Sequence, residues 1–274
     1  MPRGYEGVSV KRFTMTNGQQ LHYFDSGQGP ALVLLHGWAM SSAIFSHAIH
    51  PLAQNFRLLV PDLRGHGESD PGDHYTLDYF ATDVLQWLES LNLESFFLLG
   101  WSLGGQVAIH LAANGSLPIK RLILVSSTPK FCQGVDWESG LPQSQVRAME
   151  RQFHRDPRTT FNDFAALLFA GEKSGKELAE KVRARSILPE AKAGLAALTT
   201  LKSGDLRGEL KNIRIPTLIH HGRADTVIPV SAGLFLAEQI PNAETSLWDH
   251  VGHAPFLSYP ERSQSLWKEF LLES

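Results

Sequence analysis

The sequence predicts an α/β protein with a mostly parallel, doubly wound sheet and an inserted helical cap. Two observations carry this prediction. Short apolar runs alternate with helical patterns along most of the chain, and the alternation breaks once, between about residues 128 and 212. Most of the apolar runs are unbroken, which is typical of strands that helices cover on both faces.

The first predicted element is a β-hairpin, and six further apolar runs follow it. Asn17-Gly18 separates two strand-like runs, and this dipeptide is a strong hairpin signal. The later runs are residues 31–35, 57–61, 96–99, 121–126, 215–220 and 244–248. Helical patterns fill the intervals, for example at residues 77–91 and 263–272. This rhythm predicts parallel strands joined by crossover helices.

Residues 128–212 interrupt the rhythm. They are mostly helical in pattern, with charged faces and aromatic positions, and they are too long for a plain connection. We therefore expect a core of residues 1–127 and 213–274 and a cap of residues 128–212. The alternative is extra packing with no role over an active site.

Composition limits the classes of function. The net charge is −3, which gives no reason to expect a nucleic-acid partner. The single cysteine, Cys132, cannot form an intrachain disulfide and favours a reducing, cytoplasmic compartment. We expect no membrane span, because no apolar run in the sequence is long enough for a membrane helix. We expect no secretory signal at residues 1–6, because this segment lacks an apolar stretch. His220-His221 lacks the spacing of a helical zinc site, so we expect no metal and no other cofactor.

The segment around Ser102 predicts a nucleophilic serine. Gly100-Trp101-Ser102-Leu103-Gly104 follows an apolar run and precedes a helical pattern. A Gly-x-Ser-x-Gly elbow of this kind exposes the hydroxyl at a helix N-terminus, which favours developing negative charge. Because a serine hydroxyl is a weak nucleophile, it needs a base, an acid that orients the base and an oxyanion hole.

An acid and then a histidine should follow the serine along the chain. Asp225 and His253 each come just after a predicted late strand, where open α/β sheets place their sites. Asp249 competes for the role of acid, but it adjoins the histidine loop and does not leave a strand of its own. His250 competes for the role of base, but His253 follows a glycine and lies deeper in the loop. We therefore predict Asp225 and His253.

Two backbone amides are the expected oxyanion hole. One is that of Leu103, directly after the nucleophile, and the other is that of Trp38 in the turn His36-Gly37-Trp38. We expect His36 to brace this turn and the Trp38 indole to wall the acyl site. The Gly-rich residues 62–69 lack the Gly-Lys-Ser/Thr of a phosphate-binding loop, so we interpret them as structural.

Taken together, these motifs resemble the α/β-hydrolase fold family. The matching segments span most of the chain: residues 36–38, 62–69, 100–105, 222–229 and 252–256. A serine at position 102 argues against the haloalkane dehalogenase and epoxide hydrolase branches, whose nucleophile is an aspartate. The resemblance implies a hydrolase that works through an acyl-enzyme, with no cofactor.

Within this family, the chain resembles the carboxylesterases of biotin synthesis, which hydrolyse pimeloyl-[acyl-carrier protein] methyl ester. The resemblance is carried by residues 34–38, 99–105, 125–129 with Phe131, 164–167 with Gly171-Glu172, and 253–256. It implies that the cap segment Phe164, Ala165, Ala166, Leu167 and Leu168 lines the acyl channel. It also implies that the substrate contacts Trp38, Ser102, Leu103 and His253.

The same resemblance implies that basic cap residues dock an acidic acyl carrier protein. The cap carries Arg147, Arg151, Arg155, Arg158, Lys173, Lys176, Lys181, Arg183 and Arg185, whereas Asp163 stands where the family has an arginine. Acidic residues are interspersed, so a solvated face of mixed charge is the alternative.

Three functions stay in view from the sequence. The preferred one is an esterase of a carrier-linked methyl ester. The second is a general short-chain carboxylesterase, or a related hydrolase of small esters. The third, a ligand-binding receptor on a hydrolase scaffold, is disfavoured by the complete set of Ser102, Asp225 and His253.

Overall fold

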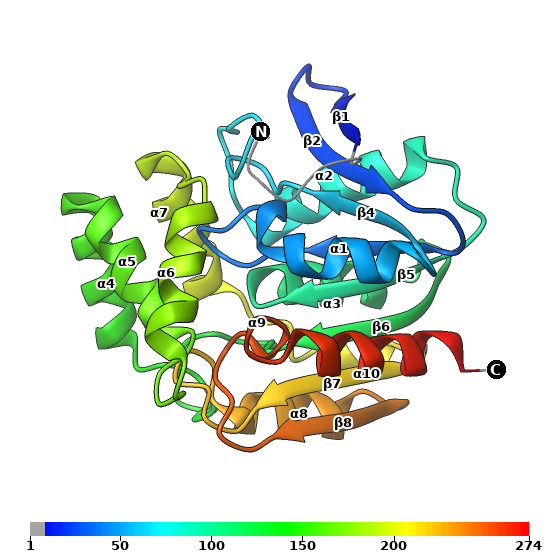
Figure 1. Ribbon diagram of the computed structural model, residues 1–274. Helices are drawn as coiled ribbons and strands as arrows, with labels where there is room; N and C mark the ends of the chain where they lie inside the picture. Colours follow the sequence, from blue (N-terminus) through cyan, green and yellow to red (C-terminus); the bar gives the residue numbers. More distant parts are fainter. Residues whose placement is uncertain (1–8, 274) are drawn as a thin grey trace.

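Eight strands form one sheet in the computed structural model, which describes residues 9–273 (Figure 1). The strands are β1 Ser9–Thr14, β2 Gln20–Ser26, β3 Ala31–Leu35, β4 Arg57–Pro61, β5 Phe96–Trp101, β6 Ile119–Val125, β7 Thr217–Gly222 and β8 Ala243–Trp248. Their order is β1-β2-β4-β3-β5-β6-β7-β8. β2 pairs antiparallel with β1 and β4, and the other pairs are parallel. The predicted mostly parallel α/β sheet, with a hairpin at its start, is confirmed.

Helices cover both faces of this sheet (Figure 1). On one face lie the 3₁₀ helix η1 Ser42–Phe45, α1 Ser46–Ala53, the short α9 Pro255–Ser258 and α10 Pro260–Leu272. On the other lie α2 Leu77–Ser90, α3 Leu103–Asn114 and α8 Val230–Gln239. Because both faces are covered, β3, β5 and β7 are buried along their whole length, which explains their unbroken apolar sequences. None of the helices in residues 9–273 has the length and apolar character to cross a membrane.

The seventh strand lies two residues further along the chain than the sequence predicted. β7 begins at Thr217, because Pro216 has no N–H for the ladder. It continues to Gly222, which pairs with Trp248 of β8. The prediction that residues 1–6 carry no secretory signal falls outside the described residues.

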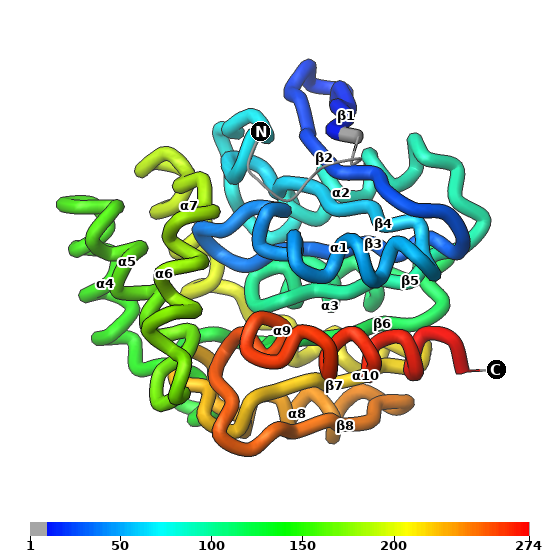
Figure 2. Tube along the Cα trace, viewed as in Figure 1, coloured from blue at the N-terminus to red at the C-terminus, as the bar shows by residue number. Residues whose placement is uncertain are grey.

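Four helices lie between β6 and β7, beyond the ends of the parallel strands (Figures 1 and 2). They are α4 Gln143–Arg155, α5 Pro157–Leu167, α6 Gly175–Arg185 and α7 Ala191–Ser203, and a turn, η2 Leu210–Asn212, leads back to the sheet. We call α4 to α7 the helical insertion. Asp156 begins α5 by accepting the N–H of Thr159, and Pro157 occupies its first position.

The chain changes direction across the sheet at β3. β4 follows β3 on one side, and β5 lies on the other. The connections from these neighbouring strands leave in opposite directions, and open α/β sheets bind ligands at the carboxyl ends of the strands beside such a point. The turn after β3 and the turn after β5 both lie at these ends, and they contain Trp38 and Ser102.

Candidate active site

Ser102 lies at the sharp turn between β5 and α3. Its backbone has φ +56° and ψ −116°, a conformation that residues other than glycine rarely adopt. The turn depends on close approaches between chain segments. A Cβ on Gly104 would lie 2.3 Å from the carbonyl oxygen of Leu35, and one on Gly100 would lie 2.3 Å from that of Gly104. The two glycines therefore allow β3, β5 and α3 to meet around the serine.

The turn after β3 packs directly against Ser102. A Cβ on Gly37 would lie 3.1 Å from the Cβ of Ser102. Leu103 is the first residue of α3, where amides have no carbonyl partner within the helix. Within residues 9–273, neither the Trp38 N–H nor the Leu103 N–H donates a hydrogen bond to another residue. Both amides are therefore available to an anion that forms beside the serine.

His253 and Asp225 form a buried pair. His253 Nδ1 lies 2.7 Å from Asp225 Oδ2, and both side chains are fully buried. Asp225 Oδ1 accepts the N–H groups of Val227 and Ile228, each at 2.8 Å. Burial alone would raise the pKa of Asp225, but His253 and hydrogen bonds from His221 and His253 outweigh it and hold that pKa well below its usual range. Asp225 is ionised and fixes the proton of His253 on Nδ1.

The second ring nitrogen of His253 is left as an acceptor. Nε2 is buried and makes no hydrogen bond within the described part of the chain. Trp101, the residue before Ser102, donates its indole N–H to the His253 carbonyl at 2.9 Å. The Trp101 and His253 rings lie 5.5 Å apart. The loop of His253 is thus bound to the turn of Ser102, and bonds between such groups often tighten only when substrate is present.

The helical insertion also binds the histidine loop. The His253 N–H donates to the carbonyl oxygen of Leu168 at 2.8 Å. The next amide back, that of Gly252, donates to Glu172 Oε1 at 2.8 Å, and this oxygen also accepts the Ser258 hydroxyl at 3.0 Å. The position of the imidazole therefore depends on the segment between α5 and α6 as well as on β8.

Asp249 and His250, the alternatives for acid and base, do not take part in the Asp225–His253 pair. His250 is exposed and has a left-handed backbone, with φ +60°. Asp249 faces solvent and pairs with Arg223 at 3.2 Å. Of the residues in this loop that the sequence put forward, His253 is the one that meets Asp225.

His36 braces the turn after β3, as the sequence predicted. It donates through Nδ1 to the Gly37 carbonyl and accepts the Leu63 N–H at Nε2, both at 2.9 Å. Burial lowers the pKa of His36 to about 4, so the ring is neutral, as these two bonds require. In the Gly-rich loop that follows β4, the Asp62 carboxylate accepts backbone N–H groups of Ser42 and Glu68. These internal bonds agree with the structural interpretation of residues 62–69.

A cavity of about 490 Å³ lies between α4, α5 and the loop after β7. Its lining is mostly apolar and includes Val146, Met149, Phe164 and Leu167. Phe164 also packs edge-on against Trp38, with ring centroids 5.0 Å apart. Phe164 is thus shared between the cavity and the wall beside Ser102.

The predicted substrate-binding residues fall into two groups. Phe164 and Leu167 line the cavity. Ala165 and Leu168 are buried and Ala166 is exposed, and these three are not part of its lining. The cavity lining also does not include the other four residues, which are buried at the carboxyl ends of the strands: Trp38, Ser102, Leu103 and His253. The Phe164 ring, which lines the cavity and touches Trp38, connects the two groups.

Two residues of the site were not predicted from the sequence. His221 Nε2 lies 3.3 Å from Asp225 Oδ2. In the sequence, His221 drew attention only as a possible metal ligand. A position at the end of β7, four residues before Asp225, is the signal that could have identified it. Glu172 reaches Gly252 across 80 residues, and no local pattern reveals such a contact. Within residues 9–273, no group of three or more His, Cys, Asp or Glu side chains could hold a metal ion.

Comparison with known families identifies the fold. The family model described as the alpha/beta hydrolase fold matches residues 30–260, which is most of the chain. The chain belongs to this family. The fold predicted from Gly100–Gly104, His36–Trp38 and the late acid and histidine is therefore confirmed.

Relatives with curated names narrow the comparison. The chain is 38% identical over 246 residues to a pimeloyl-[acyl-carrier protein] methyl ester esterase of Nitrosomonas europaea, covering 88% of this chain and 96% of that one. It is 35% identical to the enzyme of the same name from Vibrio vulnificus, covering 88% and 94%. The predicted resemblance to this group of esterases is confirmed, and the chain is an α/β hydrolase related to them along nearly their whole length.

Solved structures agree on the fold. An esterase of Exiguobacterium antarcticum superposes with a TM-score of 0.92 at 26% identity, covering 97% of this chain and all of that one. A bromoperoxidase of Bacillus anthracis superposes with a TM-score of 0.90 at 24% identity, over the same shares. A single fold thus carries differently named activities, so function has to be argued from the site.

Proposed function

We propose that the protein is a serine carboxylesterase with Ser102 as nucleophile, His253 as base and Asp225 as the acid that orients it. The observation that carries this proposal is the buried Asp225–His253 pair, whose free Nε2 belongs to a loop bound to the serine turn. An ionised Asp225 fixes the tautomer that can accept a proton at Nε2.

The reaction proceeds in two halves. His253 Nε2 takes the Ser102 proton as Oγ attacks the ester carbonyl, and the Trp38 and Leu103 amides stabilise the oxyanion. The tetrahedral intermediate then collapses, and the imidazolium gives its proton to the departing alkoxide, which leaves as the alcohol. A water molecule, deprotonated by His253, attacks the acyl-enzyme and releases the acid with the serine regenerated.

The substrate that we propose is the methyl ester of a pimeloyl group carried by an acyl carrier protein. The names of the relatives, at 34% to 38% identity, support it. The mostly apolar cavity behind Phe164 suits an aliphatic chain that enters when this ring moves. On this proposal residues 128–212 are a cap over a core of residues 1–127 and 213–274, and the enzyme works in the cytoplasm, where carrier-linked acyl groups are made.

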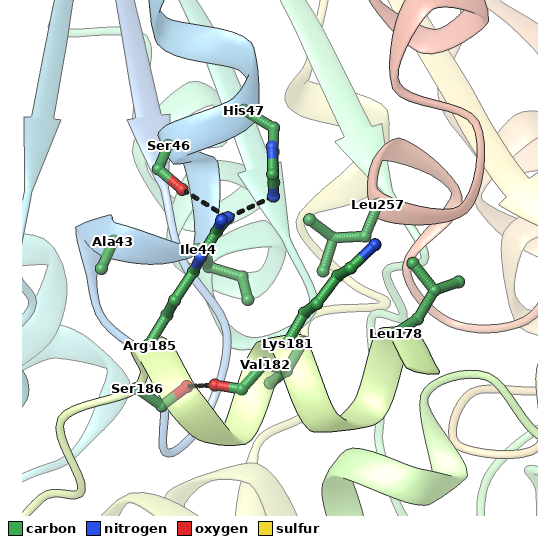
Figure 3. Close-up of a pocket in the computed structure, with 10 residues that line it drawn as sticks. All are labelled: Ala43, Ile44, Ser46, His47, Leu178, Lys181, Val182, Arg185, Ser186 and Leu257. Carbon is green, nitrogen blue, oxygen red and sulfur yellow. Dashed lines mark hydrogen bonds between the residues drawn. The ribbon is translucent and has the colours of Figure 1, made fainter. Parts of the chain in front are cut away.

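Basic residues of the helical insertion differ in how far they are already engaged. Arg183 donates to the Asn162 carbonyl. Figure 3 shows Arg185 reaching across a small crevice to Ser46 and His47, beside Lys181. In contrast, Arg151, Arg155 and Arg158 are exposed on α4 and α5. We assign the docking of the acidic carrier to these three arginines.

The decisive experiment reverses the charge of these three arginines. The Arg151→Glu, Arg155→Glu, Arg158→Glu variant should raise KM for the carrier-linked methyl ester more than about tenfold, because each lost attraction weakens encounter and docking. KM for a p-nitrophenyl ester should stay within about twofold. Lys176→Glu, an exposed change on α6, is the control for net charge. Equal effects on both substrates would remove carrier docking from the proposal.

Complementation provides the independent test of the substrate. Expression of the chain should restore growth without biotin to a strain that lacks its own pimeloyl-ester esterase, and the Ser102→Ala variant should not. If the chain fails to restore growth while hydrolysing small esters efficiently, the substrate proposal is wrong.

A general short-chain carboxylesterase is the second candidate. Asp163, in place of an expected arginine, and the likeness to solved esterases such as that of Exiguobacterium antarcticum favour it. It requires kcat/KM for small esters to exceed that for the carrier-linked ester, which the same kinetic comparison measures.

A further inference from the structure

The carboxylate of Asp225 contacts two histidines. His221, from the end of β7, places Nε2 3.3 Å from Asp225 Oδ2 and 2.9 Å from the carbonyl oxygen of Ile228. The same Oδ2 receives His253 Nδ1 at 2.7 Å. All three side chains are buried. The reaction described above uses only one of these histidines.

The neighbours of His221 decide where its proton lies. An ionised carboxylate and a backbone carbonyl can only accept hydrogen bonds, so Nε2 carries the proton and donates it. Nδ1 is buried and has no partner within residues 9–273, so a second proton there would be a buried donor without an acceptor. Nε2–H therefore donates to the Ile228 carbonyl at 2.9 Å and also faces Asp225 Oδ2 at 3.3 Å.

The sequence of α8 makes room for this ring. A Cβ on Gly233 would lie 2.6 Å from His221 Nδ1. Any larger residue at this position would displace the ring from its present place beside the carboxylate. Gly233 is thus part of the arrangement that holds His221 against Asp225.

With His221 included, four N–H groups surround the Asp225 carboxylate. Two backbone amides bind Oδ1, His253 Nδ1 binds Oδ2 at 2.7 Å, and His221 Nε2 lies 3.3 Å from Oδ2. A carboxylate held in this way cannot rotate, and its charge is shared among four donors. Without His221, the negative charge of the Asp225 carboxylate would act more strongly on His253.

We propose that His221 is a positioning residue that fixes the Asp225 carboxylate and moderates its hold on His253. The inference rests on the proposed function, because it concerns the acid of the same site. If His221 moderates this hold, Asp225 stabilises the protonated form of His253 less strongly than it would alone. The base must give up its proton at each half-reaction, so a moderated hold favours turnover near neutral pH.

The other titratable groups near Asp225 are few. His220 precedes His221 on β7 and points to the opposite face of the strand, where it accepts the Trp267 indole N–H. Burial lowers the pKa of His220 to about 3, so it is neutral. Glu172 reaches the amide of Gly252, next to His253, and Gly233 of α8 faces the His221 ring.

The test is the pH dependence of kcat/KM for a small ester. In His221→Phe, Asp225 loses one donor and holds the protonated base more strongly. The acid limb should therefore move to higher pH by about half to one unit, and kcat at the optimum should fall about tenfold. His221→Gln, whose amide can still donate, should keep the limb closer to that of the wild type.

His220→Phe is the matched control, because it removes a buried histidine from the same strand. It should lower the thermal midpoint without moving the acid limb. Gly233→Ala provides a second route, since its methyl group displaces the His221 ring, and should shift the limb in the same direction as His221→Phe. If the His221→Phe limb coincides with that of the wild type, or if His220→Phe shifts it equally, the proposal is wrong.

Ser102→Ala separates this inference from the proposed function. An active Ser102→Ala enzyme would overturn the esterase mechanism itself. An inactive Ser102→Ala enzyme, together with an unchanged profile in His221→Phe and Gly233→Ala, would overturn only the role of His221.

Discussion

The loops at the ends of β5, β7 and β8 and the helical insertion are stabilised in different ways. In the loops, backbone groups take part in holding the functional residues: two amides bind the Asp225 carboxylate, and the His253 carbonyl accepts the Trp101 indole N–H. In the insertion, side chains make the connections, as in the Lys202–Glu150 ion pair at 2.6 Å. Backbone contacts tolerate sequence change in neighbours, whereas side-chain contacts change with each substitution. On the proposed function, we therefore expect the loops to govern the chemistry and the insertion to govern selectivity.

The two regions meet at the segment between α5 and α6. The Leu168 carbonyl and the Glu172 carboxylate both accept amides of the histidine loop. The insertion therefore cannot move as a whole without disturbing the base. The comparison predicts that loop changes affect all substrates equally, that insertion changes affect selectivity, and that changes at the junction affect kcat.

The largest effect is expected at the nucleophile. Ser102→Ala removes the attacking oxygen and should reduce kcat by several orders of magnitude, as the roughly 10⁶-fold loss for such a serine in subtilisin indicates. The reduction should be the same for a small ester and a carrier-linked ester. Hydrolysis rates followed by alcohol release measure it, and near-normal activity would contradict the assignment of the nucleophile.

The next largest effect distinguishes the two histidines of one loop. His253→Ala removes the buried base and should lower kcat by about 10⁴-fold or more. His250→Ala changes an exposed residue three positions earlier and should lower kcat less than about tenfold, through loss of its turn conformation. Steady-state kinetics of both variants decide the matter, and a reversed order would transfer the role of base to His250.

An intermediate effect is expected at the junction. In Glu172→Gln, a neutral amide replaces the charged acceptor of the Gly252 N–H, and that hydrogen bond weakens. We expect kcat to fall about tenfold for every ester, with little change in KM. Glu177→Gln, which breaks an exposed pair with Lys181 on α6, is the control. If both variants behave alike, the histidine loop does not depend on the insertion.

The smallest effect is expected in the cavity. Asp163 is the one charged side chain among the described residues that line it, and it accepts a hydrogen bond from Gln152 at 2.8 Å. A carboxylate there repels an anionic far end of the acyl chain. Asp163→Asn should raise kcat/KM about threefold for a monomethyl dicarboxylate and leave a neutral ester of equal length unchanged. Equal changes for both esters would show that the far end of the chain does not enter the cavity.

The sequence was most informative where a motif is local. Gly-x-Ser-x-Gly predicted the turn at Ser102, and the structure has a strained backbone there with glycines at the close approaches. The strands at residues 31–35 and 57–61 were predicted with their observed bounds, because unbroken apolar runs report burial on both faces. The end of β7 was misplaced by two residues, because its pairing with β8 lies outside the strand's own sequence.

The sequence by itself determined the fold class, the family and the order in which serine, acid and histidine follow strands. These depend on patterns within a few residues of each other, which backbone sterics and burial impose directly. The sequence predicted Asp225 and His253, but tertiary structure decided the geometry of their contact, the place of His221 beside the same carboxylate and the bond from Glu172 to the histidine loop. It also decided that Phe164 lies between Trp38 and the cavity. Each of these contacts joins separate elements, and their geometry exists only after the sheet is paired and the helices are packed.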